Sequence, residues 1–243
     1  SDAFGKPISF AQGAGFGLRR DGGRSMAGGI GALIEGDGDD DYYGHVYSQG
    51  CAYWWSLGIC EERGGNDTYR CLWYSLGSAP HMAIGCMTDL YGDDRYNVDD
   101  RDAVTQYQAC ARDTSIGIFI DGMGDDQYFH RNRCAGTGDL NSIALFWDRY
   151  GNDLYDTYLA GPYISDPPYG SAYFYEDSGT IRDEIKTVGL FLDTQGLDTF
   201  NIDPVDYEGT KPNCADNWNW GHNTGPYLWG NGLDIDWYAA ATP

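Results

Sequence analysis

Short stretches dominated by apolar residues recur along the chain, and each stretch ends at a turn rich in glycine and aspartate. Residues 116–120 and 143–147 are examples, and both are rich in residue types that favour β-strands. No stretch has the spacing of an amphipathic helix, and a glycine recurs inside the stretches, where it would weaken a helix. The pattern therefore predicts short β-strands joined by tight turns, in an all-β protein.

The stretches belong to six copies of one pattern, aligned on a glycine in the turn. An acid stands three places before this glycine, an aspartate two places after it and an aromatic residue four places after it. A small residue stands seven places before it and an aliphatic residue eight places before it. The six glycines are Gly38, Gly65, Gly92, Gly124, Gly151 and Gly196, at spacings of 27, 27, 32, 27 and 45 residues.

A period of 27 residues indicates a particular architecture. At about 3.3 Å per residue it gives a path of about 90 Å, which suits one three-sided coil and is too short for a propeller blade of about 40 residues. We predict a parallel β-solenoid (β-helix) of about six coils over residues 30–200, with insertions near 99–102 and about 156–187. Residues 1–29 would form an N-terminal half-coil and edge, and 201–243 an irregular, tryptophan-rich C-terminal cap or docking segment.

The strands are apolar on both faces. We expect the positions eight, six and four before the glycine, such as Ile116, Ile118 and Ile120, to face the core. A sheet that is apolar on both faces is normally covered on both. The opposite row would then lie under the protein's own loops or against another subunit. Its candidate assembly contacts are Leu33, Met87, Phe119, Phe146 and Phe191.

Stacked coils would turn each acidic position into a column with one step every ~4.8 Å. Carboxylates this close repel, so they must take up protons or bind cations. Oxygen-only ligands beside a glycine turn suit calcium, and several ions are expected; a solvated acidic turn is the alternative. The candidate ligands are Glu35, Asp39, Asp40, Glu62, Asn66, Asp67, Asp89, Asp93, Asp94, Asp121, Asp125, Asp126, Asp148, Asn152, Asp153, Asp193 and Asp198.

The turn also carries a family resemblance. Residues 64–69, Gly-Gly-Asn-Asp-Thr-Tyr, and the Gly-Asp-Asp-x-Tyr of other copies resemble the calcium-binding repeats of secreted repeats-in-toxin proteins, which implies calcium here. That family repeats every nine residues, whereas this chain has one motif per 27, so the resemblance is confined to the turn. The longer pattern resembles uncharacterised secreted bacterial proteins with Gly-Asp-Asp-x-Tyr repeats.

The aromatic residues four places after each turn glycine would form a column of their own in the stacked coils. We expect Tyr42 and its equivalents to stack within the wall of the fold rather than bind a ligand. The start of the chain resembles the second half of a repeat, which would leave an unpaired edge. The tryptophans near the end form a cap, a docking element for another subunit or a carbohydrate platform. They are Trp218, Trp220, Trp229 and Trp237.

The composition excludes some classes of binding partner and indicates a cellular compartment. With 37 acidic and 15 basic residues the chain has a net charge of −22, which argues against binding nucleic acid or anionic membranes. No apolar run reaches the ~18 residues of a membrane span. Seven cysteines without a Cys-x-x-Cys pair favour disulfides in an oxidising compartment, at the cell surface or outside the cell. Cys60 and Cys86, in adjacent copies but offset by one place, should point to opposite sides.

No catalytic motif stands out. The four histidines fall at unrelated positions, and the carboxylates recur in every copy, which points to structure. The one non-repeating charged cluster is Arg182, Asp183 and Glu184. The sequence predicts a secreted, calcium-stabilised structural protein that self-associates, as a subunit of an extracellular filament or surface layer. The alternatives are a carbohydrate-binding or polysaccharide-cleaving β-helix and a calcium-folded part of a larger secreted protein.

Overall fold

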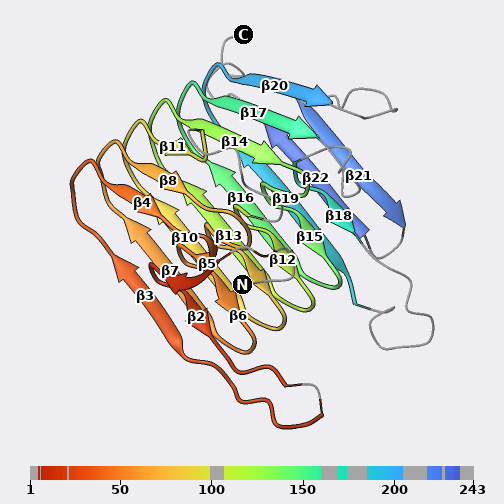
Figure 1. The fold of residues 1–243 in the computed structure, drawn as a ribbon. Coiled ribbons are helices and arrows are strands. Elements are labelled where there is room, and N and C mark those ends of the chain that lie inside the picture. The colour runs from red at the N-terminus through yellow and green to blue at the C-terminus, as the bar shows by residue number, and fades with distance from the viewer. Residues whose placement is uncertain are drawn as a thin grey trace.

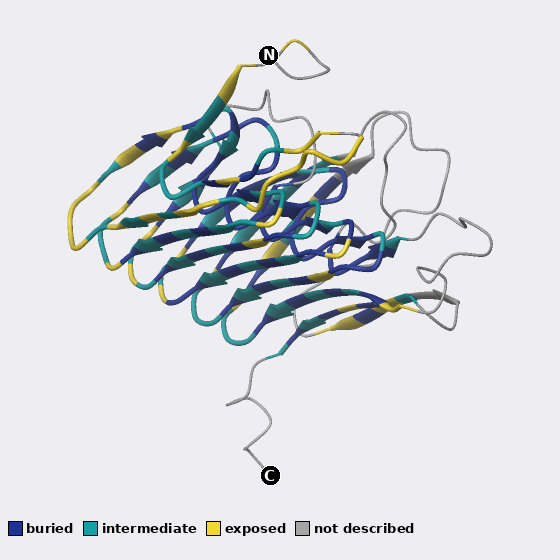
Figure 2. Ribbon diagram, turned by 90° about the horizontal axis from the view of Figure 1, so that it is seen from below, coloured by how far each residue is buried: buried dark blue, intermediate teal, exposed yellow. Residues whose placement is uncertain are grey.

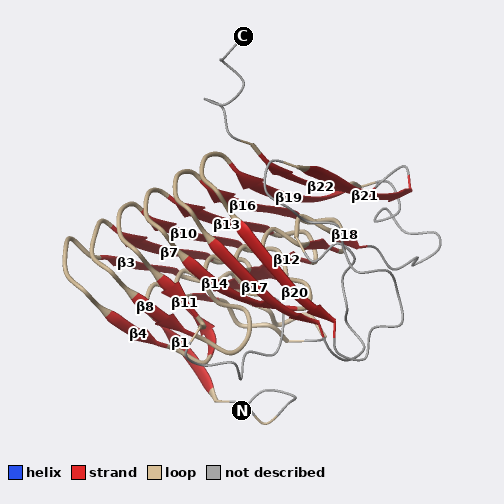
Figure 3. Ribbon diagram, turned by 90° about the horizontal axis from the view of Figure 1, so that it is seen from above, coloured by secondary structure: helices blue, strands red, loops and turns tan. Residues whose placement is uncertain are grey.

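The protein is described here by a computed structural model of the 243-residue chain. It describes residues 5, 7–20, 22–98, 107–159, 169–173, 185–204, 218–225 and 228–235. This part of the chain consists of strands and loops (Figure 3), so the fold is all-β as predicted. It includes no helix long and apolar enough to cross a membrane. The expected features at residues 99–102, Arg182, Asp183, Glu184, Cys214 and Trp237 lie outside the described residues.

An eight-stranded sheet receives one strand from each copy of the repeat (Figure 1). Its order is β21-β22-β19-β16-β13-β10-β7-β3, and every pairing is parallel except that of β21 with β22. The strands are β3 (Ile30–Ile34), β7 (Leu57–Glu62), β10 (Ile84–Asp89), β13 (Ile116–Asp121), β16 (Ile143–Asp148), β19 (Thr187–Asp193), β21 (Asn219–Gly225) and β22 (Leu228–Asp234).

A six-stranded parallel sheet follows the acidic turns. It is formed by β4 (Asp41–Tyr43), β8 (Thr68–Arg70), β11 (Arg95–Tyr96), β14 (Gln127–Arg131), β17 (Leu154–Leu159) and β20 (Thr199–Pro204). A four-stranded sheet contains β9 (Ala79–Pro80), β12 (Ala111–Arg112), β15 (Gly138–Asp139) and β18 (Ala172–Tyr173), the last of which lies within the predicted insertion. Two smaller pairs are β1 (Ile8–Ala11) with β5 (Val46–Ser48), and β2 (Gly15–Phe16) with β6 (Ala52–Tyr53).

The strand register confirms the alignment of the copies. Ile84 pairs with Leu57 on one side and with Ile116 on the other. Tyr96 pairs in the same way with Tyr69 and Tyr128. Residues that share a column in the sequence therefore lie side by side in the sheets, one strand apart.

The predicted inner and outer faces of the eight-stranded sheet are reversed. Phe119, Phe146 and Phe191 are fully buried in the core, and Met87 with them, whereas Ile84 and Ile143 are more than 40% exposed. Buried and less buried residues alternate along these strands (Figure 2). Side chains without exposed surface cannot touch a second subunit, so these four residues are core and not assembly contacts. Leu33, at the first strand, packs against the same core.

The small residue seven places before the turn shows why this side is the inner one. A Cβ at Gly58 would lie 2.0 Å from the carbonyl oxygen of Cys51. The backbone at Cys51 therefore lies directly against this side of the sheet. Gly85 meets the carbonyl of Ser78 at 2.3 Å in the same way. The column is small because the backbone of the segment that precedes each strand passes directly against it.

Two aromatic ladders fill the interior. Neighbouring rings of the tyrosine column, from Tyr42 to Phe200, are stacked with centroids 4.7–5.0 Å apart, as expected for a wall-forming ladder. The phenylalanine row, Phe119 to Phe146 to Phe191, stacks at 4.9 and 5.1 Å. Both ladders bury large apolar area with little polar surface, which stabilises the fold.

The C-terminal tryptophans divide between core and surface. Trp220 is 8% exposed and covers Gly232, where a Cβ would meet its indole ring, so it caps the phenylalanine row and is not an assembly contact. Trp218 and Trp229 are 53% and 51% exposed. The strand that carries Trp229, β22, extends the eight-stranded sheet by a seventh in-register step that the sequence analysis missed.

The expected disulfides are absent from the described cysteines, all six of which are free thiols. Cys60 and Cys86 do point to opposite sides, because Cys60 pairs with Met87 and Cys86 pairs with Ile59. Cys60 is buried, while Cys86 is partly exposed on the outer face.

Candidate metal centre

The acidic turns begin at glycines in a conformation that other residues rarely adopt. Gly65 and Gly92 have φ angles of 144° and 152°. A Cβ at Gly65 would stand 1.6 Å from the carbonyl oxygen of Gly38 in the neighbouring turn. Only glycine fits where successive turns stack this closely, and this explains why the same residue recurs at the anchor position.

The aspartate two places after each glycine forms an inner ladder. The Asp67 N–H donates to Oδ1 of Asp94 at 2.7 Å, and the Asp94 N–H donates to Oδ1 of Asp126 at 2.6 Å. The same bond joins the remaining neighbours of the column, Asp40 to Asp67, Asp126 to Asp153 and Asp153 to Asp198. One oxygen of each carboxylate is thereby fixed by the backbone of the preceding copy.

The acid three places before the glycine ends its strand inside the fold, against the tyrosine ladder. The Tyr96 hydroxyl donates to Oδ2 of Asp121 at 2.7 Å, and the Tyr128 hydroxyl donates to Oδ2 of Asp148 at 2.7 Å. Tyr69 and Tyr155 reach Asp89 and Asp193 in the same way. The tyrosine column therefore orients the strand-end acids as well as packing the core.

The two acidic columns meet in buried clusters. One oxygen from each of three residues lies within 4.8 Å of the others in the following groups: Asp67, Asp89 and Asp94; Asp94, Asp121 and Asp126; Asp126, Asp148 and Asp153; Asp153, Asp193 and Asp198. All nine residues are buried. Consecutive clusters share an aspartate, so they form one continuous row.

Eight of these nine carboxylates have an oxygen that their hydrogen bonds do not use. Oδ1 of Asp89, Asp121, Asp148 and Asp193 and Oδ2 of Asp67, Asp94, Asp126 and Asp153 are buried without a hydrogen-bond partner. A buried carboxylate oxygen without a partner is costly, so each cluster calls for a cation or a proton. The clusters can hold metal ions.

The raised pKa values of these acids also indicate that the clusters need protons or cations. Burial raises the pKa of Asp89 to about 6 and that of Asp67 to about 7. Burial and the charge of Asp89 raise the pKa of Asp94 to about 9, and burial with Asp148 raises that of Asp153 to about 11. At neutral pH a metal-free row would therefore retain protons.

The charge of the row matches divalent cations. Its four clusters contain nine distinct carboxylates, so four divalent ions would leave one net negative charge, whereas four monovalent ions would leave five. Calcium binds oxygen at 2.3–2.6 Å, and oxygens on opposite sides of one ion are about 5 Å apart. Oxygens within 4.8 Å of one another therefore suit a single ion.

The position just after the glycine forms a separate, outer ladder. Asp39, Asn66, Asp93, Asp125 and Asn152 are all exposed. Their side chains accept backbone N–H groups of the next copy, as from Asp93 to Asn66 Oδ1 and from Asp125 to Asp93 Oδ1, both at 2.9 Å. The three aspartates among them, Asp39, Asp93 and Asp125, belong to none of the carboxylate clusters of the described residues.

The two ends of the row differ from its middle. At the first turn Glu35, Asp40 and Glu62 form a cluster that is only partly buried. At the other end, buried Asp234 of β22 lies near Asp193, whose pKa it helps to raise. Sequence analysis missed Asp234; the signal was present in Gly230 and Asp234, which match the small and acidic columns.

Neither His81 nor His130 belongs to a carboxylate cluster of the described residues. His130 is buried in the aromatic core, where burial lowers its pKa to about 3. His81 Nδ1 lies 2.8 Å from Asp113 Oδ2, and Arg19 Nη1 lies 3.0 Å from its other ring nitrogen. Arg19 thus occupies the place that a nucleophile would take beside such a pair.

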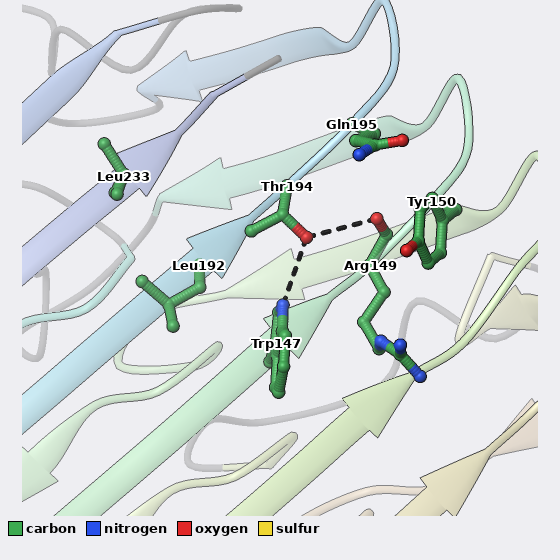
Figure 4. A pocket seen from close by; sticks show the side chains of 7 residues that line it. All are labelled: Trp147, Arg149, Tyr150, Leu192, Thr194, Gln195 and Leu233. Atoms are coloured by element: carbon green, nitrogen blue, oxygen red, sulfur yellow. Dashed lines mark hydrogen bonds between the residues drawn. The ribbon is translucent and has the colours of Figure 1, made fainter. Parts of the chain in front are cut away.

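A hollow of about 410 Å³ lies at the end of the outer face, over β16, β19 and β22 (Figure 4). The Trp147 indole N–H donates to Thr194 Oγ1 at 3.2 Å, which fixes its ring. The Arg149 guanidinium lies 5.5 Å from the Trp147 ring and 5.4 Å from the Tyr150 ring. The other residues that line it are Leu192, Gln195 and Leu233.

Comparison of the chain with protein-family models, with curated proteins and with solved structures finds no match. The function must therefore be inferred from the fold and from the acidic row.

Proposed function

We propose that the chain is a parallel β-solenoid whose buried acidic row binds several divalent cations, calcium foremost, and that bound ions stabilise the fold. Its role would be structural, in a secreted protein at the cell surface or outside the cell. There it would be a self-associating subunit of a filament or surface layer. In this description each 27-residue copy is one coil.

The observation that carries the proposal is the set of unpartnered carboxylate oxygens inside the row. Solvated turns would expose their aspartates, as the outer ladder does, but the inner aspartates are buried and face one another. The likeness of the turn to calcium-binding repeats of secreted proteins supports calcium among the divalent ions. Calcium is abundant outside cells, and this supports the proposed compartment.

The testing experiment is thermal unfolding followed by circular dichroism, with millimolar calcium and again after exhaustive chelation. Ions bound only by the folded state stabilise it by mass action, and several sites should raise the midpoint by tens of degrees. Ion content after desalting, measured by mass spectrometry of the metal, should reach about four per chain. An unchanged midpoint and an ion-free protein would reject the proposal.

A second candidate function, carbohydrate binding, is favoured by the hollow over β16, β19 and β22. Two aromatic rings, an arginine and a glutamine surround it, and sugars commonly bind to such groups. Glycan-array binding that is lost in Trp147→Ala, with an unchanged melting temperature, would support this function. Polysaccharide cleavage would require release of reducing sugar by the purified protein.

A further inference from the structure

The outer face of the eight-stranded sheet is an apolar surface on an acidic protein. Three side chains of each of its seven parallel strands point outward, and most of them are isoleucine, leucine or valine. These strands are β3, β7, β10, β13, β16, β19 and β22. Its middle row is typical: Ala32, Ile59, Cys86, Ile118, Leu145, Leu190 and Asn231, which lie side by side through the strand register.

Nothing in the described part of the chain covers this face. None of its outward side chains in β3, β7, β10, β13, β16, β19 and β22 is buried. Ile30 is 76% exposed, Ile34 59%, Ile84 43% and Ile143 47%. Contiguous apolar surface of this extent usually marks an interaction site.

The face carries almost no charge although the chain has a net charge of −22. Among its outward side chains Glu61 is the one charged residue, and Arg63 Nε lies 2.7 Å from Glu61 Oε1. Two further cations lie over rings at the margins of the face, Arg149 over Trp147 and Lys186 over Trp229. A polar or anionic ligand would find no partner over the middle rows, whereas another uncharged apolar surface would.

Its dimensions suit a second protein of similar shape. Seven strands at ~4.8 Å and about five residues at ~3.3 Å give a flat area on the order of 550 Å². Two such faces together would bury about 1,100 Å², which reaches the lower limit of specific interfaces. Extended sheets normally find a second layer, and two sheets pack about 10 Å apart.

We propose that the outer face of the eight-stranded sheet binds the same face of a second copy of this chain. The two copies are related by a two-fold axis, so each row of isoleucine and leucine packs against a row of its partner. The inference rests on the proposed structural role and assigns its self-association to this face. The buried phenylalanine row takes no part in it.

A reversible dimer follows from the size of the face. Interfaces below about 1,200 Å² are typical of transient complexes, whereas obligate dimers bury about 2,000 Å² or more, so we expect a reversible dimer. The charge of each copy opposes association, so cations that bind the acidic rows should strengthen it, as should added salt.

The test is sedimentation equilibrium of the wild-type protein and of outer-face variants, in calcium and at increasing concentration. Wild-type protein should pass from monomer to dimer. Ile118→Lys or Leu145→Lys, near the centre of the face, should raise the dissociation constant at least tenfold, because each would bury a charge at the interface. Leu154→Lys is the matched control, since Leu154 is a partly exposed leucine on the six-stranded sheet.

Cys86 supplies an independent measurement. It lies beside Ile118 in the middle row and, among the described cysteines, is the one that is not buried. Alkylation of Cys86, located by peptide mass spectrometry, should slow as concentration rises, with the same midpoint as dimerisation. In Ile118→Lys the rate should not depend on concentration.

Three outcomes would overturn the inference. The first is a wild-type protein that stays monomeric at millimolar concentration in calcium, whether Cys86 is reactive or protected throughout. The second is association that Ile118→Lys and Leu145→Lys leave unchanged. The third is weaker association that occurs only in variants with a lowered melting temperature, because a loss of folding would then explain it. A monomer that calcium still stabilises would leave the cation proposal standing, so the two failures are distinguishable.

Discussion

Asp93 and Asp94 are adjacent in the chain but lie in different environments. Asp93 is exposed and its Oδ1 accepts the N–H of Asp125, while Asp94 is fully buried and shared between two carboxylate clusters. Both side chains accept a backbone N–H group of a neighbouring copy, but only Asp94 faces the acidic row. Substitutions at the two positions can therefore distinguish a role in the turn from a role in binding ions.

The first prediction compares Asp94→Asn with Asp93→Asn. Both amides retain Oδ1 as an acceptor, but only Asp94→Asn removes charge from the clusters. In calcium, Asp94→Asn should lower the melting temperature by several degrees, because ions lose a ligand. In metal-free buffer it should equal or exceed the wild type, because repulsion falls. Asp93→Asn should change stability by less than about 0.5 kcal/mol in both buffers. Equal effects of the two substitutions would contradict ion binding in the row.

The second prediction concerns pH. Folding raises the pKa values of the buried acids, so the folded state holds protons that the unfolded state releases. Their stabilisation is complete below the unfolded pKa of about 4 and is lost as pH rises through about 6 for Asp89, 7 for Asp67 and 9 for Asp94. Asp89 alone accounts for about 3 kcal/mol between pH 4 and pH 7.

Denaturant unfolding of the metal-free protein should therefore show stability falling between pH 4.5 and pH 8. In saturating calcium the dependence should reverse, because ionised carboxylates bind the ions better. A metal-free protein that becomes more stable over this range would show that the acids are ionised and satisfied without ions.

A third prediction tests which side of the eight-stranded sheet is inside. Phe119→Ala should cost about 3–5 kcal/mol, because it opens a cavity in a fully buried row. Ile118→Ala, one residue away on the outer face, should cost about 1 kcal/mol or less in the monomer. Urea unfolding at low protein concentration measures both. Comparable losses would mean that the outer row is also covered.

The fourth prediction compares two glycines of one column. A Cβ at Gly58 would lie 2.0 Å from the Cys51 carbonyl oxygen, whereas at Gly117 the nearest atom is the Cys110 carbonyl oxygen at 2.9 Å. Gly58→Ala should destabilise by about 1–3 kcal/mol, and Gly117→Ala by less than about 1 kcal/mol. Ala144 already occupies the same column, so the neighbouring copy accommodates a Cβ at this position. Differential scanning calorimetry of both variants provides the measurement.

Several features were predictable from the residues. The register of Ile84 with Ile116, the tyrosine ladder and the meeting of Asp67, Asp89 and Asp94 all follow from columns that a fixed period places side by side. The seventh step at β22 was missed because its strand lacks the turn glycine and aspartate that anchor the other copies.

The inside and the outside of the sheet were not decided by the alternation of residues, because both rows are apolar. What decides it is closure: the backbone near Cys51 passes against Gly58, so the side with the glycine, Cys60 and Glu62 must face inward. Because this side faces inward, Phe119 is a core residue and not a contact with another subunit. The strand-end acids are buried for the same reason, since each lies two residues after the phenylalanine row and points to the same side of the sheet.

The sequence by itself determined the repeat, the parallel in-register stacking and the two acidic columns, because these depend only on period and spacing. Tertiary structure alone decided that both of these columns are buried and meet, with the strand-end acids against tyrosine hydroxyls, while the residues just after the turn glycine remain exposed. It also decided that an isoleucine surface faces outward. Burial depends on which segments of distant sequence close over a side chain, and no local pattern in the chain records that.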